Sequence, residues 1–389
     1  MADVHRGRQR SQPPLRSSPW VLSLIATSWF LAACGSGGKP ITIGVAGNFQ
    51  DPSSAPMQHA AQLAILEINQ AGGVRGRPIE ILLRDDHEDA DSAIMIATDL
   101  YRAGVVAVVG HGFSGPTLAA AAVYNGGQDP VVQISPSASS PEVTEAGPYT
   151  FRLCPTDLAH GAALARWVRQ DLGLSNGAIL YINNAYGRGF RTTFADEFGS
   201  LEGEIEVAFP FLGDAPEVGP LLDRITSPEI QFLVVAGYLS DAEEILLQAN
   251  QRGMTIPVLG GDGLEGIERV GPLAEGTYVT AAYLPTIDTP RNRTFVEAYQ
   301  AMFPDEPAPN ISAAGTYDAI HLLRDIIARV GTDRTRIRDA LAALGTTGAP
   351  FEGVLGTVAL DSNGDVINPA VHVSVVYDGV VTPPGNRAP

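Results

Sequence analysis

The sequence predicts an α/β protein of two lobes, each built on a doubly wound parallel sheet. Three observations support this fold class. Short β-branched runs at residues 105–109 (VVAVV) and 131–134 (VVQI) have the length of buried strands, and a helix-sized segment separates them. Strand and helix signals alternate along most of the chain, which favours parallel strands with right-handed crossovers. The alternation starts again near residues 151–157 (FRLCPTD), so a second lobe follows the first.

In the first lobe, strand signals alternate with amphipathic segments that end at glycines. The expected elements are a strand at 41–46, a helix from Met57 to the Ala71-Gly72-Gly73 stop, a strand at 79–83, a helix at 92–103 closed by Gly104, and the strands at 105–109 and 131–134.

The second lobe repeats this pattern without repeating the sequence. Its expected elements are helices at 158–171, 189–199, 217–225 and 241–252 and strands at 178–182, 205–209, 232–236 and 257–259. From about Tyr283 the chain becomes helical again, at 291–303, 311–330 and 334–344. Two strands at 357–360 and 371–377 flank the turn signal DSNGD, which predicts a hairpin.

Small polar and aromatic residues follow several of the predicted strands. They are Ser114, the cluster Ser135, Ser137 and Ser139, the segment NNAYG at 183–187, Gly237-Tyr238, and the loop GGDG at 260–263. In open α/β sheets, ligands bind beyond the carboxyl ends of the strands. We therefore expect these loops to meet in a cleft between the lobes.

The chemistry of these loops suits an α-amino acid. Hydroxyl and N–H groups of the first lobe can receive a carboxylate, and Asp262 can accept hydrogen bonds from an ammonium group. Tyr186 and Tyr238 can cover the ligand with apolar and cation–π contacts. The residues alone leave other interpretations open: Asp262 as a solvated turn residue, and the tyrosines as ordinary half-buried residues at strand ends.

The first 33 residues have the pattern of an export signal. Four arginines precede an apolar run at 21–33, which is too short to span a bilayer permanently. The sequence Leu31-Ala32-Ala33-Cys34-Gly35 resembles the lipobox of bacterial lipoproteins, in which the cysteine is acylated and becomes the new N-terminus. With lipidation, residues 34–40 form the acylated cysteine and a short flexible tether. The alternative is a free cysteine after an ordinary signal peptide.

Charge and cysteine content restrict the partners. The chain carries 25 Lys and Arg against 43 Asp and Glu, a formal net charge of −18. We therefore expect no nucleic-acid partner. The only cysteines are Cys34 and Cys154, so lipidation of Cys34 would leave no pair for an intrachain disulfide.

No catalytic or metal-binding motif emerges. The acidic loop 85–91 contains His87 but has no spacing that fixes a metal geometry, and DSNGD lacks the glycine and glutamate positions of a calcium loop. The segment Gly112-Phe113-Ser114-Gly115 is not a nucleophile elbow, and nearby His111 has no sign of a triad partner. We expect no catalytic residue, metal or cofactor.

Several stretches resemble, in order, the type I periplasmic binding proteins of branched-chain amino acid ABC importers. They are ITIGVAG, AILEINQAGGVRGRPIEILLRDD, VVGHGFSGPT, ISPSASSPEVTEAG, NNAYGRG, VVAGYLSDAEEILLQANQRGM and LGGDG. The resemblance implies that Ser114, Ser137, Ala138 and Ser139 bind the ligand carboxylate side, with the Ser137 carbonyl facing the ammonium. It also implies that Tyr186 and Tyr238 cover the ligand, and that Asp262 binds the ammonium in place of the more usual glutamate.

The resemblance further implies a three-segment hinge, with crossings near 151–157, 280–283 and 353–356. The expected lobes are 41–153 with 283–354, and 154–282 with 355–389. The loop 48–58 departs from the family pattern by lacking its glycines, and in the family this loop helps form the side-chain pocket.

Together these features predict an exported, lipid-anchored, monomeric protein in the periplasm or on the cell surface. It would bind an aliphatic amino acid, branched-chain or related, and deliver it to an ABC permease. A sensory binding protein of the same fold for amides or small carboxylates is one alternative. An exported hydrolase using Ser114 is the other.

Overall fold

The computed structural model describes residues 38–213, 218–225 and 227–384. The predicted signal segment 1–33 and Cys34 lie outside these residues. Within the described part of the chain, no helix combines the length and apolar character needed to cross a bilayer.

The first sheet is parallel throughout, with the strand order β2-β1-β3-β4-β5. Its strands are β1 Ile41–Gly47, β2 Ile79–Asp85, β3 Ala107–Gly110, β4 Val132–Ser135 and β5 Thr150–Arg152. The helices between them are α1 Pro56–Gln70, α2 Ala90–Arg102 and α3 Ser114–Gly126, and the 3₁₀ helix η1 Pro141–Glu145 precedes β5. The strands β3 and β4 are buried along their whole length, as their β-branched runs predict.

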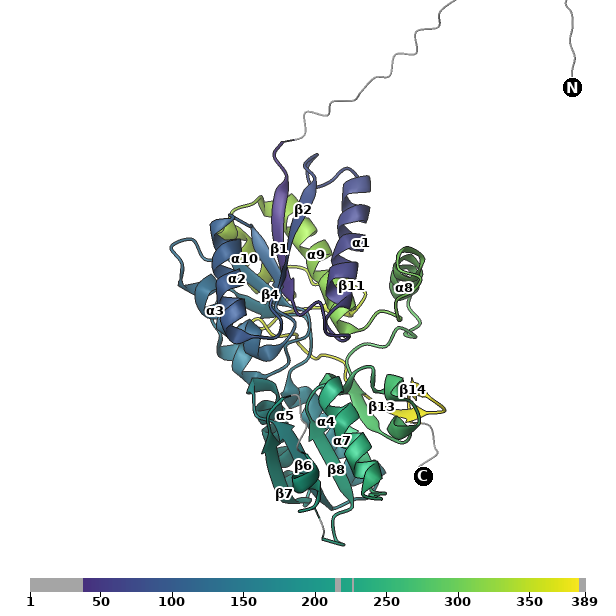
Figure 1. The fold of residues 1–389 in the computed structure, drawn as a ribbon. Helices are drawn as coiled ribbons and strands as arrows, with labels where there is room; N and C mark the ends of the chain where they lie inside the picture. Colours follow the sequence, from purple (N-terminus) through teal and green to yellow (C-terminus); the bar gives the residue numbers. More distant parts are fainter. Residues whose placement is uncertain (1–37, 214–217, 226, 385–389) are drawn as a thin grey trace, which may run out of the picture. The chain divides into compact units, whose positions relative to one another are not determined.

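Helices from late in the sequence complete this first lobe. They are α8 Pro290–Met302, α9 Ile311–Val330 and α10 Arg334–Ala342. Figure 1 shows α9 beside α1, next to the first sheet. The buried face of α9 includes Ala319, Ile320 and Leu323, which share one core with Ile43 and Val45 of β1. The apolar face of this 20-residue helix therefore packs on a sheet whose strands lie far away in sequence.

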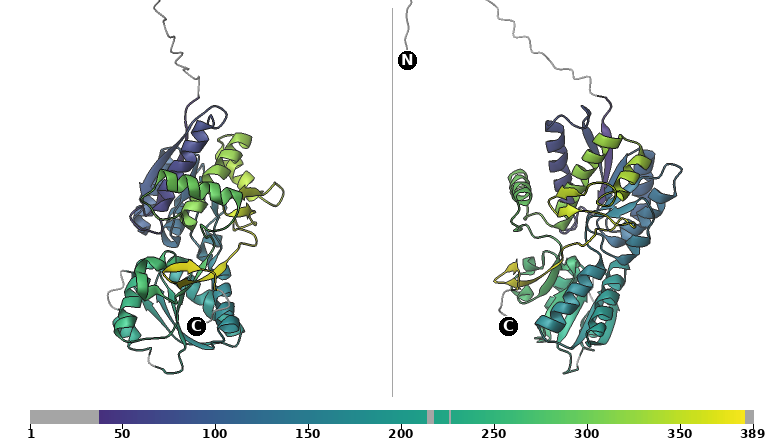
Figure 2. Two further views of the ribbon diagram at one scale, coloured as in Figure 1. Left: turned by 90° about the vertical axis from the view of Figure 1, so that its right-hand side faces the viewer. Right: turned by 180° about the vertical axis from the view of Figure 1, so that it is seen from behind.

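The second sheet has the order β14-β13-β10-β9-β8-β6-β7. Its strand β13 runs antiparallel to both of its neighbours, β10 and β14. Its strands are β6 Asn176–Ile182, β7 Glu204–Phe211, β8 Phe232–Ala236, β9 Val258–Gly260, β10 Tyr278–Ala281, β13 His372–Tyr377 and β14 Val380–Thr382. Its helices are α4 Asp157–Arg166, continued by the π-helical turn η2 Trp167–Asp171, then α5 Ala185–Ser200, α6 Gly219–Leu222, α7 Leu239–Gln251, and the 3₁₀ helices η3 Asp262–Leu264 and η4 Ile267–Ala274. Figure 2 shows the C-terminal strands at the edge of this sheet.

The predicted fold class is confirmed: two doubly wound sheets, parallel except for the antiparallel pairing of β13 at one edge, joined by three chain segments. One predicted connection is wrong. The turn at residues 361–365 does form, closed by the Leu360–Val366 bridge, but the strands on either side do not pair with each other. Instead, β12 Gly356–Val358 pairs with β11 Phe351–Gly353, while β13 joins the second sheet.

The third crossing, which the resemblance places near residues 353–356, lies later in the chain. Val358 and Leu360 belong to the core of the first lobe rather than to the second. The reason lies in the next turn, where the backbone N–H of Arg152 donates to the carbonyl of Gly364 and its side chain pairs with Asp365. These bonds hold the turn on the first lobe until after Asp365.

Candidate functional site

In each sheet, the strand order changes direction at a central strand, and the loops around both of these points line one cavity. In the first sheet β1 lies between β2 and β3, and in the second β6 lies between β7 and β8. Loops that follow strands on the two sides of such a point diverge and leave a crevice. The loops after β1 and β3 and those after β6 and β8 all contribute to this cavity.

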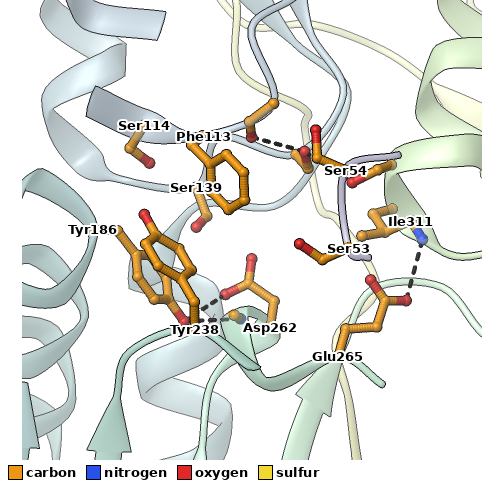
Figure 3. A pocket seen from close by; sticks show the side chains of 14 residues that line it. Ser53, Ser54, Phe113, Ser114, Ser139, Tyr186, Tyr238, Asp262, Glu265 and Ile311 are labelled. Carbon is orange, nitrogen blue, oxygen red and sulfur yellow. Dashed lines mark hydrogen bonds between the residues drawn. The ribbon is translucent and has the colours of Figure 1, made fainter. Parts of the chain in front are cut away.

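The cavity contains about 440 Å³ of empty space, part of it open to solvent. Figure 3 shows the lining side chains. They belong to Ser53, Ser54, Gly112, Phe113, Ser114, Ser137, Ser139, Tyr186, Tyr238, Asp262, Gly263, Glu265, Ile311 and Ser312. Six of the seven predicted ligand residues are among them, and Ala138 is not.

The first lobe contributes hydroxyl groups and a helix N-terminus. Ser114 is the first residue of α3, and its Oγ accepts the N–H of Ser140 at 3.2 Å. The Oγ of Ser137 donates to the carbonyl of Gly112 at 2.8 Å and lies 3.2 Å from the Oγ of Ser312. The first N–H groups of a helix have no partner within it, so this wall offers donors for an anion.

Buried Arg152 fixes the serine loop and explains the position of Ala138. Its Nη1 donates to the carbonyls of Ala138 at 3.0 Å and Ser140 at 2.9 Å. The Ala138 side chain is buried in the protein, outside the cavity lining. Ala138 therefore helps to position its serine neighbours, because its carbonyl is engaged by Arg152.

The second lobe contributes aromatic rings. Tyr186 lies in the first turn of α5 and Tyr238 is the N-cap of α7. Their rings stack with centroids 5.1 Å apart and an interplanar angle of 16°. Phe113 of the first lobe meets the ring of Tyr238 edge-on, at 4.8 Å. Burial raises the pKa of both phenols well above their ordinary value, so both tyrosines are neutral.

Asp262 lies at the start of η3 and is held by Tyr186. The Tyr186 hydroxyl donates to Asp262 Oδ1 at 3.2 Å and accepts the N–H of Gly263 at 2.9 Å. The other carboxylate oxygen lies 3.6 Å from Nε2 of His160. Burial lowers the pKa of His160, which favours its neutral form. Among the described residues, no Lys, Arg or His lines the cavity, so no cation of the lining pairs with the Asp262 side chain.

A second acid lies behind Asp262. Asp157, the first residue of α4, is fully buried. Burial, reinforced by the charge of Asp262, raises its pKa well above the ordinary value. Burial therefore disfavours the charged forms of both Asp157 and His160.

Sequence reasoning missed several lining residues. Glu265 and Ile311 carry no local signal that places them at a site, since Ile311 belongs to a helix that follows the second crossing. Phe113 stands next to the predicted Ser114, and its aromatic character was the available signal. Ser53 and Ser54 fall in the loop that the family resemblance assigns to the side-chain pocket.

The acidic loop after β2 has structural partners for its carboxylates. Asp85 accepts the N–H of His87 at 3.0 Å, and Asp89 caps α2 by accepting the N–H of Ser92 at 2.7 Å. Asp86, fully buried, pairs with Nδ1 of His111 at 2.6 Å. The described residues contain no group of three or more side chains arranged to hold a metal ion.

Residues 40–379 match the family described as periplasmic binding proteins. The chain belongs to this family. It is 27% identical to the leucine-, isoleucine-, valine-, threonine- and alanine-binding protein of Pseudomonas aeruginosa, over 84% of this chain and 87% of the relative. These matches confirm the resemblance to the branched-chain amino acid group.

Two solved structures extend the similarity. One is the branched-chain amino acid transporter substrate binding protein of Streptococcus pneumoniae in complex with isoleucine, with a TM-score of 0.79 and 27% identity over 88% of this chain and 97% of that one. The other is an ABC transporter substrate-binding protein of Desulfitobacterium hafniense in complex with leucine, with a TM-score of 0.76 and 28% identity over 89% and 99%.

Family membership excludes one of the alternative functions, the exported hydrolase. Periplasmic binding proteins are substrate-binding transport proteins and not enzymes, which rejects the hydrolase that would use Ser114. Membership also places the protein outside the cytoplasm.

Proposed function

We propose that this periplasmic binding protein is the substrate-binding component of an ABC importer and that it binds an α-amino acid in the cavity. The observation that carries the proposal is the opposition of two chemistries across one cavity. Serine hydroxyls and the start of α3 offer hydrogen-bond donors on one side, and the Asp262 carboxylate offers acceptors on the other. A zwitterion with one carboxylate and one ammonium satisfies both sides.

In this proposal the ligand carboxylate contacts Ser114 and Ser139. The ammonium contacts Asp262 and the carbonyl of Ser137, whose hydroxyl donates to Gly112. Tyr186 and Tyr238 cover the main-chain atoms of the ligand. Phe113 and Ile311 provide apolar contact for an aliphatic side chain, which is the class expected from the resemblance. The relatives that bind leucine or isoleucine support the class of ligand.

The proposed lobes, 41–153 with 283–354 and 154–282 with 355–389, would close on the ligand about the three-segment hinge. The third crossing described above would move the last boundary beyond Asp365. An ABC permease would then recognise the closed, ligand-bound, monomeric protein.

A thermal-shift screen over amino acids, small amides and carboxylates tests the proposed ligand class. An α-amino acid should raise the melting temperature in proportion to ln(1 + [L]/Kd), whereas amides and carboxylates should not. Stabilisation by amides or carboxylates alone would favour the sensory alternative instead.

We further propose that residues 1–33 are a lipoprotein signal and that acylated Cys34 anchors the protein to a bacterial membrane. Labelling of cells with a radioactive fatty acid tests this anchor. The wild-type protein should incorporate label and fractionate with membranes, and Cys34→Ser should do neither. Membrane association of unlabelled Cys34→Ser would contradict the lipid anchor.

A further inference from the structure

A second carboxylate lines the cavity, away from Ser114. Glu265 follows η3, and its side chain belongs to the cavity wall. One of its oxygens accepts the N–H of Ile311, the first residue of α9, at 3.1 Å. Figure 3 shows the Glu265 carboxylate on the same side of the cavity as Ser53 and Ile311.

This end of the cavity is built from segments that hold one another in place. The Asn310 side chain caps α9 by accepting the N–H of Ala313 at 3.0 Å. Its Nδ2 donates to the carbonyl of Ser53 at 2.7 Å, which ties the loop after β1 to the start of α9. Glu265 joins the same unit through Ile311, so its carboxylate has a fixed place in the wall.

The number of acids exceeds what an aliphatic amino acid needs. Asp262 and Glu265 are the acids of the described lining, which contains no Lys, Arg or His. The ammonium of an amino acid accounts for one of them. An aliphatic side chain would leave the other Glu265 oxygen, which does not accept from Ile311, facing methyl groups, and desolvating a polar atom without giving it a partner is costly.

We propose that Glu265 determines specificity and that the preferred ligand is an α-amino acid whose aliphatic side chain ends in a nitrogen donor, an ammonium or a carboxamide. This inference rests on the proposed function, because it takes the ligand main chain to be held by Ser114 and Asp262. The aliphatic part of the side chain then passes Phe113 and Ile311, and the terminal nitrogen donates to Glu265. The expected ligand thus changes from an amino acid with a purely aliphatic side chain to one whose aliphatic side chain ends in nitrogen.

Two pairs of ligands with equal numbers of non-hydrogen atoms test the inference by titration calorimetry: asparagine against leucine, and ornithine against norleucine. The nitrogen-bearing member of at least one pair should bind roughly tenfold or more tightly than its aliphatic partner. The pair that shows the preference tells a carboxamide from an ammonium. Leucine and norleucine binding at least as tightly as their partners would overturn the inference.

Two variants at the same position complete the experiment. Glu265→Leu should abolish or reverse the preference for nitrogen, and Glu265→Gln should weaken ornithine more than asparagine. Glu243→Gln removes an exposed acid of α7 and should change neither. Unchanged preference in folded Glu265→Leu, as judged by circular dichroism, would overturn the inference.

The outcomes also separate this inference from the function on which it rests. Amino-acid binding that is lost in Asp262→Ala but indifferent to Glu265 overturns only the role of Glu265. A folded wild-type protein that binds none of the four compounds and no other α-amino acid overturns both.

Discussion

The two halves of the cavity occupy equivalent places in their sheets and differ in chemistry. In the first lobe, the loops after β3 and β4 present Ser114, Ser137 and Ser139. In the second, the loops after β6, β8 and β9 present two tyrosines and an acid. One half consists of neutral hydrogen-bond donors beside a helix N-terminus, and the other of stacked rings around a carboxylate.

This difference separates what the fold decides from what the loop residues decide. Strand order fixes where the loops meet, because the loops that line the cavity lie where the strand order of each sheet changes direction. The residue types fix the sign of the charge that each half receives. A ligand that joins the halves must therefore carry an anionic and a cationic group a short distance apart.

The largest expected effect comes from the charged half. Asp262→Ala should weaken binding of the cognate amino acid by about 3–5 kcal/mol, because the ligand ammonium loses its buried counter-charge. Titration calorimetry measures this loss. The exposed acid Asp196 of α5 gives a matched control, Asp196→Ala, with unchanged affinity. Equal affinity of Asp262→Ala and wild type would remove Asp262 from the site.

The hydroxyl half should respond less strongly. Ser114→Ala removes one donor to the ligand carboxylate, and a hydrogen bond to a charged group contributes about 1.5–3 kcal/mol. Ser200→Ala, at an exposed serine of α5 whose hydroxyl donates to the carbonyl of Glu197 in the same helix, should leave affinity unchanged. A loss in Ser114→Ala larger than in Asp262→Ala would reverse the proposed ranking of the two halves.

The two tyrosines allow a finer comparison within the second half. Tyr186→Phe removes the hydroxyl that joins Asp262 to the N–H of Gly263, and should cost about 0.5–1.5 kcal/mol of affinity. Tyr238→Phe removes a hydroxyl that accepts a long 3.4 Å bond from Asn184, and should cost less. Calorimetry on both variants compares them. Equal losses would contradict a special role for the Tyr186 hydroxyl.

The smallest effect concerns pH and the ligand-free protein. Burial raises the pKa of Glu265 from 4.5 to about 8, so the folded protein retains a proton that the unfolded chain releases. Stability should therefore decrease as pH rises from about 4.5 to about 8, and Glu265→Gln should remove part of that decrease.

Thermal melts of wild type and Glu265→Gln between pH 6.5 and 8 isolate this contribution by difference. The other groups with shifted pKa values, such as Asp157, His160 and His321, are present in both proteins. The wild-type slope should be steeper than that of Glu265→Gln. Parallel slopes would show that Glu265 does not retain a proton in the folded protein.

Much of the fold was predictable because local patterns carry it. Buried strands such as β8 read as continuous apolar runs, and the predicted bounds of α9 agree with the structure because its apolar spacing ends at Gly331. The strands β5 (TFR) and β10 (YVTA) were not predicted, because neither forms a continuous apolar run. The pairing of β13 depends on tertiary contacts that no turn signal contains.

The candidate site was predictable where its residues follow strands directly, as Ser114 and Tyr238 do. Its far end was not. Ser53 and Asn310 are bonded to each other but lie 257 residues apart, and only the folded first lobe brings them together. Glu265 illustrates the same limit, because its partner Ile311 enters from beyond the second crossing.

The most direct test of the account uses one amino acid and two of its derivatives. The amino acid that stabilises the protein most is titrated beside its α-N-acetyl form, which lacks the ammonium, and its α-carboxamide, which lacks the carboxylate. We predict that both derivatives bind at least roughly 100-fold more weakly, the acetyl form because Asp262 loses its partner and the amide because the serine wall does. Binding of either derivative as tightly as the intact amino acid would contradict the division of the site into an anion-binding and a cation-binding half.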